Sequence, residues 1–169
     1  MRYCLLLLFS LITACSQIPA GLTVVDNFEL NRYLGTWYEI ARLDHRFERG
    51  LIDIHADYSL NNDGSVKIVN SGFATEQGQR QTAIGKAQFV DRPTLGSLEV
   101  AFFGPFYSAY NIIALDQIHY DYVMIAGADR DYLWILSRTP KLEQTILDQL
   151  INQANSLGFA TDKLIFDQH

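Results

Sequence analysis

Short segments with apolar residues at every second position are the feature that most constrains what this chain can fold into. In residues 51–60, Ile54, Ala56 and Tyr58 alternate with polar residues, and the stretch NNDG then supplies the residues of a tight turn. Eight such segments, counting the one that contains Trp37, follow one another at short spacing. This pattern predicts an all-β antiparallel meander, in a sandwich or a barrel.

A different periodicity begins after Thr139-Pro140. Gly158 provides a stop signal for a helix. Before it, the apolar residues recur at helical spacing: Leu142, Ile146, Leu147, Leu150, Ile151 and Ala154. We therefore expect one C-terminal amphipathic α-helix packed on the outside of the sheet, followed by a last extended piece. Nothing in the sequence indicates a second folded domain.

The N-terminus reads as an export signal. Arg2 precedes an apolar run that is too short to span a bilayer comfortably, and Ile12-Thr13-Ala14-Cys15 resembles a bacterial lipobox. That resemblance implies cleavage before Cys15 and acylation of this residue. Ser16 favours sorting to the outer membrane, facing the periplasm. We expect a lipoprotein signal peptide at 1–14, a lipidated tether at 15–27 and the folded domain at 28–169.

Cysteine content and charge narrow the function classes. Cys4 lies in the signal peptide that is cleaved off, and the thiol of Cys15 is expected to be acylated. The folded domain therefore has no disulfide. The chain has a formal net charge of −6, which makes it a poor nucleic-acid binder. Attachment to an anionic membrane must then rest on the lipid anchor at Cys15, and no nucleic-acid partner is expected.

Small residues dominate one face of the predicted strands. Ala56, Ala83, Gly85 and Ala87 share a face with aromatic residues, whereas a filled barrel core normally carries leucine and isoleucine there. An eight-stranded barrel is either filled by side chains or just wide enough for one small ligand. The pattern favours an apolar pocket for one elongated amphiphile, with a packed core as the alternative.

Two motifs far apart in the sequence resemble the paired signature of the lipocalin family. Gly35-x-Trp37-Tyr38 opens the first strand, and Arg138 follows the last one in WILSR. Together with the lipobox, they resemble the bacterial outer-membrane lipoprotein lipocalins of the apolipoprotein D-like branch. The resemblance implies an eight-stranded up-and-down β-barrel in which Arg138 lies across the ring of Trp37 at the closed end.

The resemblance also implies ligand-binding positions. Tyr58, Asn70 and Trp134 match positions that line the pocket in that branch, and the alternation pattern faces all three inward. Further positions come from the family's strand register: Val100, Phe102, Tyr110 and Met124. Glu39 shares the parity of Trp37, and its role stays open, because a carboxylate in the cavity needs a partner or a proton.

Catalytic chemistry finds no support in the sequence. There is no G-x-S-x-G or H-E-x-x-H motif, and the four histidines are scattered. We expect no catalytic residues, no metal and no cofactor.

The sequence predicts a membrane-anchored protein that stores or transports fatty acids or lysophospholipids in the bacterial cell envelope. The alternative is a structural or interaction lipoprotein with no specific ligand. The aromatic residues of 103–107 would serve the membrane or a second copy of the chain in a homodimer.

Overall fold

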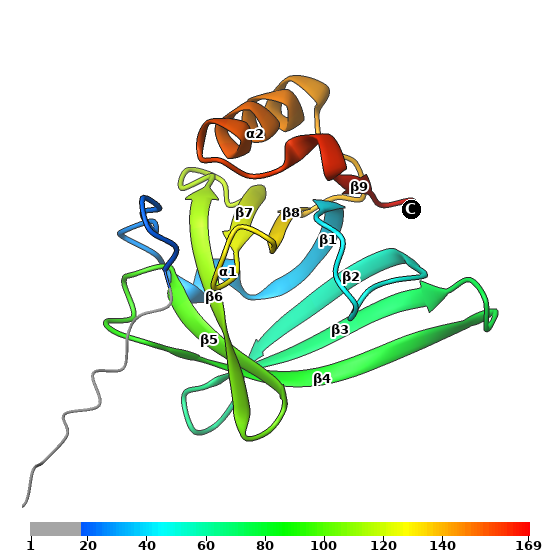
Figure 1. The fold of residues 1–169 in the computed structure, drawn as a ribbon. Coiled ribbons are helices and arrows are strands. Elements are labelled where there is room, and N and C mark those ends of the chain that lie inside the picture. The colour runs from blue at the N-terminus through cyan, green and yellow to red at the C-terminus, as the bar shows by residue number, and fades with distance from the viewer. Residues whose placement is uncertain (1–17) are drawn as a thin grey trace, which may run out of the picture.

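The structure, a computed structural model, describes residues 18–169 (Figure 1). The expected signal peptide at 1–14 and the expected lipidation site Cys15 lie outside the described residues.

Eight antiparallel strands close into a barrel because β1 pairs with β8 on one side and with β2 on the other. The strands are β1 (Gly35–Arg42), β2 (Leu51–Leu60), β3 (Val66–Ala74), β4 (Gln79–Phe89), β5 (Ser97–Phe103), β6 (Phe106–Leu115), β7 (Tyr122–Ala126) and β8 (Leu133–Ser137). Each strand pairs with its sequence neighbour, as the alternation and the short turns require. This confirms the predicted eight-stranded up-and-down barrel.

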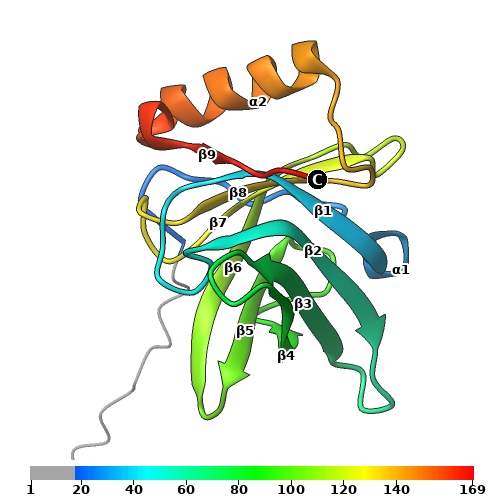
Figure 2. The same cartoon turned by 90° about the vertical axis from the view of Figure 1, so that its right-hand side faces the viewer.

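The C-terminal helix covers one outer side of the barrel (Figure 2). α2 (Gln144–Ser156) begins where the Glu143 carboxylate accepts a hydrogen bond from the Thr145 amide at 3.2 Å. Its apolar stripe packs against outward-facing residues of β1, β7 and β8. After the 3-10 turn η1 (Thr161–Lys163), a short ninth strand, β9 (Ile165–Phe166), adds to the edge of β1. No helix among residues 18–169 is long and apolar enough to cross a membrane.

The two ends of the barrel differ. The short helix α1 (Leu30–Tyr33) lies at the end where β1 begins, which we call the closed end. Because the strands alternate in direction, loops 43–50 and 127–132 lie at the opposite, open end, as Figure 2 shows. The turn between Phe103 and Phe106 is at the open end as well.

Residues 18–27 are not a free tether but pack along the barrel. Leu22 is buried with the residues beneath α2, and the Val25 amide donates to the Ile112 carbonyl at 2.9 Å. The Val25 carbonyl in turn accepts from the Gly96 amide at 2.9 Å. Apolar residues in this segment therefore serve the fold, and residues 18–27 pack with the domain that was expected to begin at residue 28.

Trp37 and Arg138 meet at the closed end. The indole of Trp37 is fully buried, and the Arg138 guanidinium carbon lies 3.9 Å from the ring centroid. Arg138 also donates to the carbonyls of Thr36, Arg32 and Tyr120, at 2.9, 2.6 and 3.2 Å. The guanidinium thus ties α1, β1 and the β6–β7 loop together over the indole.

Gly35 makes room for this contact. Its φ of +96° is a backbone conformation that side chains disfavour, and an added Cβ would lie 3.4 Å from Arg138 Nη1. The Trp37 indole N–H donates to the Tyr33 carbonyl at 2.8 Å, which fixes α1 against the barrel. The signature residues therefore form one connected structure at the closed end.

Candidate ligand-binding site

Small side chains line one wall of the barrel interior. Trp37 is paired across the strands with Ala56, Ala56 with Asn70, and Asn70 with Ala83, so these four residues face inward at one level. Trp37 is fully buried, whereas Ala56, Asn70 and Ala83 are only partly buried. Inward side chains in a filled barrel would all be excluded from solvent, so this wall borders space that opens outward.

Asn70 places a polar group in this wall. Its Oδ1 atom is buried and accepts no hydrogen bond from any residue that the structure describes. A buried acceptor without a donor is unfavourable by about 1–3 kcal/mol. The position therefore suits the hydroxyl of a ligand or an ordered water.

Tyr58 and Tyr110 belong to a chain of three phenols near the closed end. The Tyr110 hydroxyl lies 2.9 Å from that of Tyr58 and 2.6 Å from that of Tyr33. Burial raises the pKa of Tyr58 to about 12, and burial also raises the pKa values of Tyr33 and Tyr110, so all three stay protonated. The two hydrogen bonds among these three hydroxyl groups take up two of the three protons. One hydroxyl proton is therefore left to donate to another group.

Three of the remaining expected site residues border the barrel interior, and one does not. Val100, Phe102 and Trp134 border the interior cluster and are partly buried. The ring of Phe102 lies over Gly85, where an added Cβ would come within 2.7 Å of it. Met124 does not reach the interior, because it packs beneath α2 with the outer cluster while Val123 and Ile125 face inward. We therefore leave Met124 out of the site.

A β-bulge brings two opposite charges to the inner face of β1. The register between β1 and β8 shifts between Glu39 and Ala41, so Glu39 and Arg42 lie on the same side although they are three residues apart. Arg42 Nη1 donates to Glu39 Oε1 at 2.5 Å, and both side chains are almost fully buried. Strict alternation would have placed Arg42 outside, so sequence reasoning missed this pair.

The loop 43–50 adds further polar groups to this pair. Glu48 Oε2 accepts from the Trp134 indole N–H at 3.1 Å and lies 2.9 Å from His45 Nε2. His45 is buried at the open end against the rings of Trp134 and Tyr132. We call Glu39, Arg42, His45, Glu48 and Trp134 the charged cluster.

The two carboxylates of the charged cluster titrate in opposite directions. Burial raises the pKa of Glu39 well above its usual value, and the charge of Glu48 adds to this, outweighing the effect of Arg42. Burial also opposes the charge of Glu48, but contacts from His45, Trp134 and Arg42 together lower its pKa. Glu39 therefore holds its proton to a higher pH than a free carboxyl group does, and Glu48 loses its proton at a lower pH.

Replacing Glu39 by glutamine should stabilise the protein as the pH rises. The folded state keeps a proton on Glu39 that the unfolded chain loses above a pH of about 4.3, so wild-type stability falls as pH rises toward the folded pKa. Glu39→Gln lacks this loss. We expect equal stability near pH 4 and an advantage of about 1–2 kcal/mol for the variant at pH 8, by urea unfolding.

The exposed Glu76 supplies the control for this comparison, because Glu76→Gln should leave the pH profile unchanged. A Glu39→Gln variant that is less stable than wild type at pH 8 would show that Glu39 is ionised in the folded protein.

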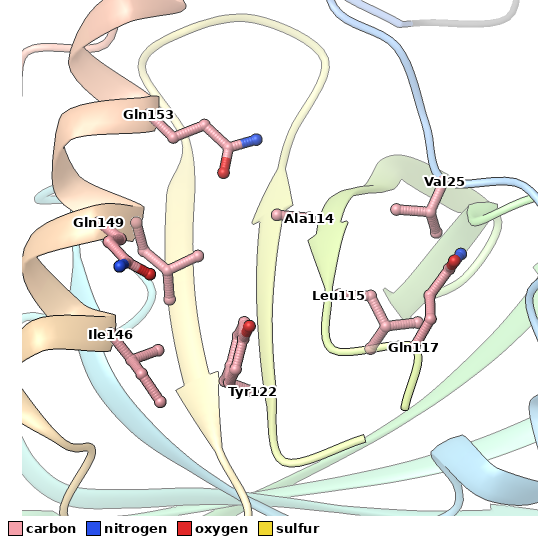
Figure 3. Close-up of a pocket in the computed structure, with 9 residues that line it drawn as sticks. Val25, Ala114, Leu115, Gln117, Tyr122, Ile146, Gln149 and Gln153 are labelled. Carbon is pink, nitrogen blue, oxygen red and sulfur yellow. The ribbon is translucent and has the colours of Figure 1, made fainter. Parts of the chain in front are cut away.

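A separate cavity of about 360 Å³ lies outside the barrel wall, between α2 and the β6–β7 region (Figure 3). Gln149 and Gln153 of α2 face it from one side, and Val25 and Gln117 from the other. Three glutamines, five aliphatic residues and Tyr122 line it. It does not include the residues expected to bind ligand.

Comparison with known proteins assigns the chain to a family. The model of the lipocalin-like domain matches residues 28–169, and the chain belongs to this family. The chain is 50% identical over 160 residues to the outer membrane lipoprotein Blc of Escherichia coli strain K12, covering 94% of this chain and 90% of that protein. It is 35% identical over 156 residues to apolipoprotein D of Macaca fascicularis, covering 89% and 79%.

Solved structures show the same fold. Insecticyanin from the tobacco hornworm Manduca sexta superimposes with a TM-score of 0.71 at 20% identity, covering 90% of this chain and 86% of that one. The family and the names of the relatives point to binding proteins rather than enzymes. The recognition of a lipocalin from Gly35, Trp37 and Arg138 is thereby confirmed.

Proposed function

We propose that this protein is an outer-membrane lipoprotein of the bacterial envelope that binds a fatty acid or a lysophospholipid in its barrel and stores or transports it. It acts by binding and not by catalysis. The observation that carries the proposal is the partly buried wall of Ala56, Asn70 and Ala83 inside a closed barrel. Each methylene of an acyl chain that leaves water for such a wall contributes about 0.8 kcal/mol.

The start of the described chain supports an anchor at the open end. The Ala20 carbonyl accepts from Arg130 Nη2 at 2.8 Å, and Arg130 belongs to the open-end loop 127–132. Cys15 is five residues before Ala20, a distance of at most about 18 Å along an extended chain. An acyl anchor at Cys15 would therefore hold the open end close to the membrane, on the periplasmic face.

Exposed aromatic residues support the same orientation. Phe47, Phe103 and Phe106 are 56%, 69% and 79% exposed, and all three lie at the open end, Phe47 in loop 43–50, Phe103 at the end of β5 and Phe106 at the start of β6. Apolar side chains at this end suit a lipid surface, from which a ligand would enter the barrel without crossing water. The same surface is where a second copy of the chain would dock if the protein is a homodimer.

Displacement of a fluorescent fatty acid tests the proposed function. Delipidated protein should bind the probe at one saturable site with a dissociation constant in the micromolar range or below, and palmitate should displace it. Non-saturable binding, or none, would favour the structural lipoprotein with no specific ligand. Native mass spectrometry of protein purified from its own envelope would then identify the lipid that it carries.

A further inference from the structure

Nitrogen donors converge on one carboxylate oxygen in the charged cluster. Glu48 Oε2 accepts from Trp134 Nε1 at 3.1 Å and lies 2.9 Å from His45 Nε2 and 3.8 Å from Arg42 Nε. These three groups come from β8, from loop 43–50 and from β1, so they surround the oxygen from separate elements. A planar guanidinium, an imidazole and an indole N–H together form a site that suits a carboxylate or phosphate oxygen.

The donors around this oxygen are not fully used. Arg42 gives one hydrogen bond to Glu39 and one to the Glu48 carbonyl, but its buried Nε has no acceptor among residues 18–169. Both ring nitrogens of His45 are also buried, and neither makes a hydrogen bond of good geometry with the described residues. Buried polar groups are normally satisfied, so the site has donor capacity beyond what Glu48 takes up.

Glu48 occupies the site from a loop and not from the barrel wall. Arg42 and Trp134 are fixed by the pairing of β1 with β8, whereas Glu48 belongs to the open-end loop 43–50. Its neighbour Phe47 is 56% exposed. A loop residue can withdraw without breaking a strand pair, while the donors of the wall stay in place.

Charge balance makes that withdrawal conditional. Arg42 lies 2.5 Å from Glu39 and 3.8 Å from Glu48 Oε2, and because the pKa of Glu39 is raised while that of Glu48 is lowered, Glu48 is the first of the two carboxyl groups to supply the negative charge that the buried Arg42 requires. Removing one partner of a buried ion pair is unfavourable unless another charge replaces it. An incoming anion at the same place meets that requirement, and an uncharged ligand does not.

We propose that Arg42, His45 and Trp134 form a subsite for the anionic head group of the bound lipid, a carboxylate or a phosphate, and that the Glu48 carboxylate fills this subsite in the ligand-free protein. The inference rests on the proposed function and adds to it the chemistry of the ligand's polar end. The acyl chain would extend from the subsite along the wall of Ala56 and Ala83 toward the closed end. Glu48 then acts as an internal competitor that selects for anionic lipids.

The test compares ligands of equal chain length that differ in head group. Palmitate and 1-palmitoyl lysophosphatidate carry the two candidate anions, and 1-hexadecanol carries none. Their dissociation constants are measured by displacement of a fluorescent fatty acid from wild type and from Glu48→Gln. The glutamine keeps the shape of the side chain and an acceptor for Trp134, but it removes the competing charge.

We expect Glu48→Gln to bind the anionic lipids about tenfold more tightly, the size of one hydrogen bond to a charged group, and hexadecanol with unchanged affinity. Of palmitate and lysophosphatidate, the lipid whose affinity increases more in Glu48→Gln identifies the head group that the subsite prefers. Asp44→Asn is the matched control, because Asp44 is an exposed carboxylate of the same loop that pairs with Arg49. Asp44→Asn should leave the affinities for the anionic lipids and for hexadecanol unchanged.

A second variant keeps the inference testable if Glu48→Gln fails to fold. Trp134→Phe removes one donor and should weaken the anionic lipids relative to hexadecanol. If the ratio of anion to alcohol affinity is the same in wild type and in these variants, the subsite is disproved while lipid binding stands. If neither palmitate nor hexadecanol binds wild type, the proposed function itself fails.

Discussion

Trp37→Ala should lower the free energy of unfolding by about 3–5 kcal/mol, the range for removing a large aromatic side chain from a core. The indole is fully buried between Tyr33 and Arg138, so its removal leaves a cavity at the closed end. It also removes the hydrogen bond to the Tyr33 carbonyl. Because a domain of this size is stable by only about 5–15 kcal/mol, the variant should unfold at a much lower urea concentration.

Three further variants test the effect of burial and the cation–π contact separately. Phe106→Ala removes an aromatic ring that is 79% exposed, so it should change stability by less than about 0.5 kcal/mol. A double-mutant cycle with Trp37→Phe and Arg138→Met should give a coupling energy of about 1 kcal/mol. Equal losses for Trp37→Ala and Phe106→Ala would contradict the assigned role of the indole.

β2 and α2 were predictable because each has water on one side and the core on the other. β2 alternates Ile54, Ala56 and Tyr58 with more polar residues, and α2 carries its apolar residues on one stripe. The pairing of Trp37 with Arg138 was predictable only from the family resemblance. No periodicity relates two residues that lie about a hundred positions apart.

β7 shows where alternation fails. Its residues are apolar at nearly every position because one face lines the barrel interior and the other lies beneath α2. A strand that is buried on both faces has no polar side to fix its register. Val123 and Ile125 face inward. Met124 was placed inward from the family's strand register, which is wrong, and the alternation pattern offered no check on it.

Three members of the charged cluster, Arg42, His45 and Glu48, escaped sequence analysis for two different reasons. The bulge between Glu39 and Ala41 changes the parity of β1, and no residue in that stretch marks its position. His45 and Glu48 lie in a loop rich in charged residues that reads as solvated, yet the loop folds back and buries His45. Backbone irregularities and loop folding arise from tertiary contacts, so local patterns carry little information about them.

Ala83→Phe should weaken fatty-acid binding by about 100-fold. Ala83 lies opposite Asn70 on the inner wall and is partly buried, so a phenyl ring there would fill the space of about four methylenes. At about 0.8 kcal/mol for each methylene, the loss amounts to about 3 kcal/mol. The fold should tolerate the change, because the ring enters open space and not a packed core. Displacement of a fluorescent fatty acid measures the effect.

The neighbouring residue provides a control on the opposite face of the same strand. Ile84 is 62% exposed on the outer face of the same strand, so Ile84→Phe adds an aromatic ring on the opposite side of the barrel wall. Its affinity should match that of wild type. If Ala83→Phe binds palmitate as tightly as Ile84→Phe, the lipid lies elsewhere, and the cavity beside α2 becomes the place to search. A parallel loss of stability in Ala83→Phe alone would mean that the interior at this level is filled, because only a packed core resists a larger side chain.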